Sequence, residues 1–196
     1  IGSGLVGSEM CIRDRCKRCV LDALETGYRL IDTAQSYFNE EDVGEAIAES
    51  GVARNDIFLT TKVWVEHYGY EETKKSVYTS LKKLKTEYLD LMLLHQPFAD
   101  YYGAYRALED LYTEGVIRAI GVSNFYPDRL VDIANFARIV PMINQVETHP
   151  LNQQTEAMKW MKKYDVQIEA WAPFGEGRGG LFENPVLAEI GKQYNK

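Results

Sequence analysis

The sequence predicts an α/β protein, specifically an incomplete (β/α)8 barrel with six of its eight strands present. Two observations carry this prediction: short apolar runs alternate with amphipathic stretches, and the runs recur about every 28 residues. Such alternation is typical of a parallel sheet with right-handed crossovers. Eight repeats of this length approach the roughly 250 residues of a closed barrel. A doubly wound open sheet is the alternative, but the turn at 34–39 lacks the glycines of its phosphate loop.

Six strands are expected where apolar runs are bounded by polar residues or glycine. They are 28–33, 57–63, 89–95, 117–123, 142–146 and 167–172. Helices are expected over 17–26, 73–85, 105–114 and 185–194. Gly27, Gly51 and Gly115 follow helical runs, where a left-handed C-cap favours glycine. Asp128 and Asn152 stand near helix starts as possible N-caps. In a barrel these strands would be the second to the seventh, so we expect the first and the eighth to be missing.

Residues 1–15 are expected to lie outside the native protein. They show neither a helical nor a strand period, and the piece from Val6 to Arg15 resembles the translation of a sequencing adapter. A genuine N-terminal arm is the alternative. The remaining residues, 16–196, are expected to form one partial barrel.

Composition excludes several classes of partner. The net charge of −7 argues against nucleic acid or an anionic membrane as the main partner, and no apolar run is long enough to span a bilayer. The three cysteines all lie within the first twenty residues, which is no disulfide framework and favours a reducing, cytoplasmic location.

Polar side chains stand at the carboxyl ends of the expected strands, where barrels carry their chemistry. They are Asp32, Lys62, His95, Ser123 with Asn124, Gln145 with Glu147, and Trp171. Lys62 and Asp32 are expected to form a buried ion pair. A lysine cation near the phenol of Tyr37 would lower its pKa and make it a general acid, and His95 would offer a second donor to a substrate oxygen. This suits reduction of a carbonyl group.

Other chemistries are less well supported. His67 and His149 lack metal-ligand spacing, so no metal is expected, and no G-x-S-x-G elbow is present. A Schiff base on Lys62, as in an aldolase, is the main alternative.

Six ordered motifs together resemble the aldo-keto reductases over about residues 19–196. They are GYRLIDTAQSYFNEEDVGEAI, IFLTTKVW, YLDLMLLHQP, GVIRAIGVSNF, INQVETHP and IEAWAPFGEG. The resemblance is to bacterial members that reduce keto-sugars, glyoxals or aldehydes. It implies a TIM barrel that binds NADPH without a Rossmann domain and reduces aldehydes or ketones to alcohols.

The resemblance also implies roles for individual residues. The family's catalytic tetrad falls on Asp32, Tyr37, Lys62 and His95. Its nicotinamide contacts fall on Ser123, Asn124 and Gln145, with Trp171 stacking on the ring. Trp64 and Phe98, together with His95, would line the substrate pocket.

The sequence departs from the family at three places. Phe38 replaces a frequent glycine, Ala172 replaces a common serine, and the segment that grips the 2′-phosphate of NADPH is expected beyond Lys196. NADPH rather than NADH is therefore implied by the resemblance alone. We expect poor NADPH affinity and negligible turnover from these 196 residues. A non-catalytic NADPH-binding or regulatory subunit is a further alternative. The expected partner is a small carbonyl compound, and the complete protein is expected to be a monomer.

Overall fold

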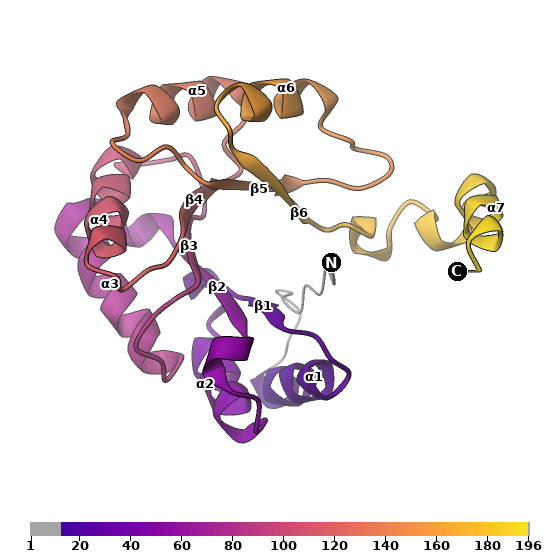
Figure 1. The fold of residues 1–196 in the computed structure, drawn as a ribbon, viewed down its shortest axis with the longest axis horizontal. Coiled ribbons are helices and arrows are strands. Elements are labelled where there is room, and N and C mark those ends of the chain that lie inside the picture. Colours follow the sequence, from indigo (N-terminus) through magenta and orange to yellow (C-terminus); the bar gives the residue numbers. More distant parts are fainter. Residues whose placement is uncertain (1–12, 196) are drawn as a thin grey trace.

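The computed structural model describes residues 13–195 as a single curled sheet with helices packed around it. The strands are β1 (Leu30–Asp32), β2 (Phe58–Val63), β3 (Leu91–Leu94), β4 (Ile120–Ser123), β5 (Ile143–Glu147) and β6 (Gln167–Trp171). Each strand pairs in parallel with the next one along the chain, in the order β1-β2-β3-β4-β5-β6. Figure 1 shows the sheet curled into an open arc with helices on its convex side. The predicted α/β architecture, an incomplete (β/α)8 barrel, is confirmed.

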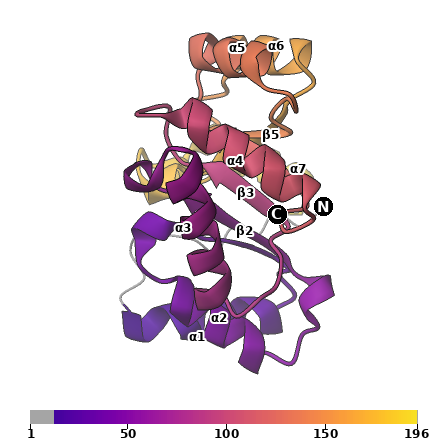
Figure 2. The same ribbon diagram turned by 90° about the vertical axis from the view of Figure 1, so that its left-hand side faces the viewer.

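Helices pack against the outer face of the sheet. They are α1 (Arg13–Glu25), which precedes β1, and the connecting helices α2 (Glu40–Glu49), α3 (Tyr70–Lys83), α4 (Tyr101–Thr113), α5 (Pro127–Phe136) and α6 (Thr155–Lys163). Helix α7 (Pro185–Gln193) follows β6, has no buried residues and lies apart from the sheet (Figure 1). Short 3-10 turns lie at Gln35–Tyr37, Arg54–Asp56, Val65–His67, Gly175–Gly177 and Leu181–Glu183. Figure 2 shows α3 and α4 running across the sheet. Helices α3 and α4 pack against each other, and α1 packs against α2.

The hydrophobic core lies between the sheet and these helices. All four residues of β3 are buried, as expected for a parallel strand that is covered on both faces. From the helix side, Tyr105 of α4 is fully buried, and Phe125, in the loop after β4, is buried with it. Because every strand is parallel to its neighbours, the carboxyl ends of all six strands lie along one rim of the arc.

The predicted helix ends are correct at the glycines and wrong at the two N-caps. Gly27, Gly51 and Gly115 all have positive φ. Asp128 lies inside the first turn of α5, because Pro127 takes the first helical position and moves the cap to Tyr126. Helix α6 begins at Thr155 with Gln154 as its cap, two residues after the cap position that Asn152 suggested.

Two expectations concern the N-terminus and membranes. Residues 1–12 of the segment expected to be non-native lie outside the described residues, and α1 begins at Arg13 within it. Within residues 13–195, no helix has both the length and the apolar character needed to span a bilayer.

Candidate active site

The structure brings most of the predicted site residues to one rim of the sheet. Asp32 ends β1, Lys62 is the penultimate residue of β2, and His95 directly follows β3. Ser123 ends β4 and Trp171 ends β6. Because the strands are parallel and in sequential order, these side chains meet although they come from five separate repeats.

A buried ion pair lies at the centre of this rim. The Lys62 ammonium donates to a carboxylate oxygen of Asp32, and the two side chains are 1% and 3% exposed. Lys62 Nζ also donates to the backbone oxygen of Thr33 at 3.0 Å. Burial alone would lower the pKa of Lys62, but the charges of Asp32 and Tyr37 and the hydrogen bond to Asp32 outweigh it and raise that pKa. Lys62 is therefore a stable cation.

Tyr37 lies over this pair at the end of a short 3-10 turn. Its ring centroid is 5.3 Å from Lys62 Nζ and 5.7 Å from the ring of His95, which it meets edge-on. Gln35, in the same turn, accepts a hydrogen bond from the backbone N–H of Trp64 at 2.9 Å and donates to Ser80 Oγ at 3.1 Å. These two bonds tie the turn that carries Tyr37 to β2 and to α3.

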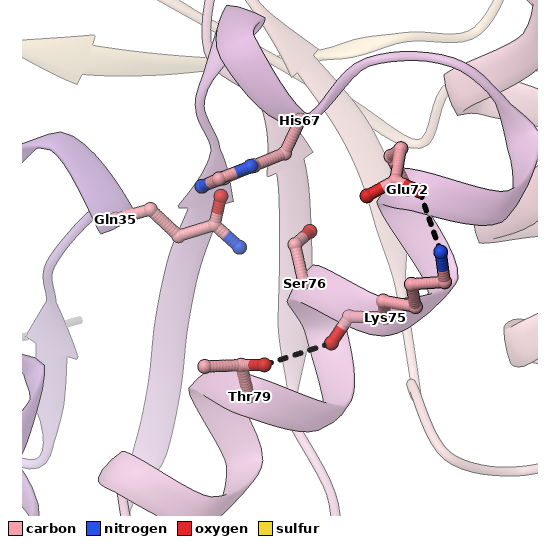
Figure 3. Close-up of a pocket in the computed structure, with 6 residues that line it drawn as sticks. All are labelled: Gln35, His67, Glu72, Lys75, Ser76 and Thr79. Atoms are coloured by element: carbon pink, nitrogen blue, oxygen red, sulfur yellow. Dashed lines mark hydrogen bonds and ion pairs between the residues drawn. The ribbon is translucent and has the colours of Figure 1, made fainter.

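A surface cavity of about 180 Å³ lies on the other side of this turn. It is lined by Gln35, His67, Glu72, Lys75, Ser76 and Thr79. Figure 3 shows Gln35 and His67 facing the polar side chains of α3 across this cavity. None of the predicted catalytic residues lines it, so the cavity is separate from the candidate site.

His95 is a neutral side chain. It is 9% exposed, and burial together with the neighbouring Lys62 cation lowers its pKa to about 4. The ring of Trp64 lies 5.1 Å from it, edge-on, and Ser36 Oγ lies 3.3 Å from its Nδ1. A neutral imidazole can donate one hydrogen bond near pH 7 without carrying a charge.

The predicted nicotinamide contacts form one hydrogen-bonded group. Ser123 Oγ donates to the backbone oxygen of Gln145 at 2.9 Å, and Asn124 Nδ2 donates to the backbone oxygen of His95 at 3.1 Å. The indole N–H of Trp171 donates to Asn124 Oδ1 at 2.9 Å. Amide and hydroxyl groups beside an indole are a set that can hold a carboxamide attached to an aromatic ring, so these residues fit the predicted cofactor.

Gln145 connects this group directly to the ion pair and also bonds to Glu169, a residue that the sequence analysis missed. Its amide nitrogen donates to Asp32 Oδ2 at 2.9 Å and to Glu169 Oε1 at 3.1 Å. Burial and the nearby Asp32 charge raise the pKa of Glu169. The available signal was a single carboxylate inside the apolar run 167–171. With both amide hydrogens bonded to carboxyl groups, the oxygen of Gln145 is left to act as an acceptor.

Phe98 and the ligation of a metal are the last two features that the sequence addressed. Phe98 lies in the loop after β3 and is 60% exposed, so its role in a substrate pocket stays a prediction. Among the described residues, no three His, Cys, Asp or Glu side chains are grouped as metal ligands would be.

Comparison with known proteins identifies the family. The model of the "Aldo/keto reductase family" matches residues 2–185. The chain is 49% identical over 175 residues to the glyoxal reductase of Bacillus subtilis (strain 168), covering 89% of this chain and 63% of that protein. It spans less than two thirds of the length of the curated relatives it matches first.

Solved structures agree with this result. An aldo/keto reductase from Brucella melitensis superimposes with a TM-score of 0.91 at 43% identity, covering 98% of this chain and 74% of that one. The Bombyx mori aldo-keto reductase in complex with NADP also gives a TM-score of 0.91, at 32% identity, covering 100% of this chain and 73% of that one. The chain belongs to the aldo/keto reductase family.

Proposed function

We propose that this chain carries the catalytic rim of an NADPH-dependent reductase that converts small aldehydes or ketones to alcohols. The observation that carries the proposal is the buried Lys62–Asp32 pair beneath the ring of Tyr37, with a neutral His95 beside it. Membership of the family supports it, as do the glyoxal reductase and the NADP complex among the similar proteins.

The cofactor would be held by the group of residues at the ends of β4, β5 and β6. When bound, NADPH supplies a hydride to the carbonyl carbon. Ser123, Asn124 and the oxygen of Gln145 would hold its carboxamide, and Trp171 would stack on its ring. The preference for NADPH over NADH comes from the family, because the residues expected to grip the 2′-phosphate are not among those described.

Tyr37 would donate the proton that the reduction requires. As negative charge develops on the carbonyl oxygen, the phenol hydroxyl transfers its proton to that oxygen and becomes a phenolate. The Lys62 cation stabilises the phenolate by its charge, and Asp32 keeps that cation in place. The negative charge of a Tyr37 phenolate in turn raises the pKa of Lys62, so each charge favours the other.

His95 would position the substrate. Its neutral ring can donate to the carbonyl oxygen without competing with Tyr37 for the role of acid. Trp64 and Phe98 would form the walls of the pocket. We propose glyoxals, other small aldehydes or keto-sugars as substrates. The monomeric state and the cytoplasmic location stay predictions.

The aldolase alternative requires an uncharged lysine. A Schiff base forms when a deprotonated amine attacks a carbonyl carbon. Lys62 has a raised pKa and donates to both Asp32 and Thr33, so its lone pair is not available for that attack. This argues for hydride transfer rather than for covalent catalysis on Lys62.

We propose that these 196 residues alone bind NADPH weakly and turn over negligibly. Among the described residues, 13–195, strands β1 and β6 each pair with one neighbour, which leaves two open edges beside the site in this part of the chain. A titration with NADPH, followed by tryptophan fluorescence, tests this. Micromolar binding by the monomeric chain would contradict it.

The role of Tyr37 is tested in a version completed to the length of its relatives. Tyr37→Phe should lower kcat for methylglyoxal or a nitrobenzaldehyde by about 10²–10⁴-fold and leave NADPH affinity nearly unchanged. Tyr70→Phe is the matched control, because its hydroxyl bonds to Asp110 on the surface, away from the site. Near-full kcat in Tyr37→Phe, or covalent labelling of Lys62 by borohydride with substrate, would overturn the assignment.

A further inference from the structure

The proton of the His95 ring can occupy either of two nitrogens. A neutral imidazole carries it on Nδ1 or on Nε2, and the two tautomers present opposite hydrogen-bonding groups at each position. The position of this proton therefore decides whether His95 can donate toward a substrate oxygen. Burial and Lys62 keep the ring neutral, so the choice between tautomers exists at the pH of most assays.

Ser36 contacts one of these nitrogens. Its Oγ lies 3.3 Å from His95 Nδ1, across a separation of 59 residues in the chain. The ring packs against the edges of Tyr37 and Trp64, and the backbone N–H of His95 donates to the oxygen of Val63 at 3.1 Å. Packing therefore holds Nδ1 toward Ser36.

We propose that the Ser36 hydroxyl donates a hydrogen bond to Nδ1 of His95 and thereby keeps the ring proton on Nε2. Ser36 is then a positioning residue, which acts on the reaction through His95. The purpose of this arrangement rests on the proposed function, since Nε2–H is the donor that a carbonyl oxygen requires.

The direction of this hydrogen bond depends on the tautomer of the ring, and two features of the site favour donation by Ser36. A serine hydroxyl in a helical turn commonly donates to the carbonyl three residues before it. For Ser36 that carbonyl belongs to Thr33, and it already accepts from Lys62 Nζ at 3.0 Å. The Ser36 hydroxyl instead lies 3.3 Å from Nδ1, and a hydroxyl that donates there requires the ring proton to lie on Nε2. In the opposite arrangement, the lone pair of Nε2 would face the lone pairs of the carbonyl oxygen and repel them.

The tautomer can be measured directly on the 196-residue chain, without cofactor. The chain contains three histidines, His67, His95 and His149. With histidine labelled by ¹⁵N, two-bond ¹H–¹⁵N correlation near pH 8 distinguishes protonated from unprotonated ring nitrogens. A His95→Asn variant assigns the signals. We expect the wild-type ring to be protonated at Nε2.

Four variants test the part played by Ser36. Ser36→Ala should lower the ratio of the Nε2–H to the Nδ1–H tautomer by about two- to twelve-fold, the net effect of one neutral hydrogen bond. Ser36→Cys, whose thiol is a weak donor, should lower it in the same direction, and Ser36→Thr should restore it. The control is Ser50→Ala, which removes a hydroxyl at the end of α2 and should leave the ratio unchanged.

Two results would overturn the proposal. One is a wild-type ring protonated at Nδ1; the other is an unchanged ratio in both Ser36→Ala and Ser36→Cys. In a version completed to the length of its relatives, Ser36→Ala should lower kcat/KM for the carbonyl in proportion to the fall in the fraction of the Nε2–H tautomer, without changing the Kd of NADPH. A chain with the expected tautomer but no reductase activity would count against the proposed function alone.

Discussion

Removing the charge of Lys62 should destabilise the fold strongly, because Asp32 would be left buried without its counter-ion. Lys62 and Asp32 are 1% and 3% exposed, so solvent cannot replace the lost partner. Breaking one side of a buried pair costs about 3–5 kcal/mol. In Lys62→Met, Gln145 still donates to Asp32 Oδ2, so we expect a loss near the lower limit, about 3 kcal/mol.

Urea denaturation followed by tryptophan fluorescence measures this loss. For a chain of this size, 3 kcal/mol corresponds to a fall in Tm of roughly 6–12 °C. Lys75→Met is the matched control, because its pair with Glu72 lies on the surface and should contribute less than about 1 kcal/mol. Adding Asp32→Asn to Lys62→Met removes the unpaired charge and should recover part of the loss. Equal stability of Lys62→Met and Lys75→Met would show that burying Asp32 without its counter-ion carries no such cost.

Three further changes test the fold around the site. For His95, the folded pKa of about 4 lies below the ordinary 6.5, so the unfolded chain binds the proton first. The wild type should therefore exceed His95→Asn in free energy of unfolding by a constant amount above pH 6.5, and this difference should fall by on the order of 3 kcal/mol toward pH 4. A pH-independent difference in urea denaturation would contradict this. In Gly44→Ala the new Cβ would lie 2.5 Å from the backbone oxygen of Lys83 and 2.7 Å from the backbone of Leu84, so α2 and α3 must separate. Calorimetry should show that the free energy of unfolding falls by about 1–3 kcal/mol, although alanine is the better helix former. Phe38 has φ 55° and is 76% exposed. Phe38→Gly should therefore relieve left-handed strain and raise the free energy of unfolding in urea by up to about 1 kcal/mol. An equal gain in Phe38→Ala would exclude strain as the cause.

The strands and the ion pair were predictable because their signals are local. Each buried strand is a short apolar run, and parallel pairing places the residue at the end of every run on the same rim. This reasoning put Asp32 beside Lys62 although 30 residues separate them. It depends only on the order of strands along the sheet, which is sequential here.

The contacts that surround this pair could not be predicted in the same way. Glu169 meets Gln145 and Ser36 meets His95 through side-chain geometry that leaves no period in the sequence. The N-cap of α5 was misplaced for a different reason: a good capping residue, Asp128, directly follows a proline that favours the first helical position. Asp128 has a high propensity to cap a helix, but Pro127 takes the first helical position and the cap is therefore Tyr126.

In the proposed reaction, the residues along the rim direct a hydride to a carbonyl carbon and a proton to its oxygen. NADPH deuterated at its hydride-donating carbon, incubated with methylglyoxal and the version completed to the length of its relatives, tests this directly by mass spectrometry of the product. We expect one deuterium on the new carbinol carbon, formed at least about 10²-fold more slowly in Tyr37→Phe. An alcohol product without deuterium, or deuterium transfer at the same rate in Tyr37→Phe, would contradict it.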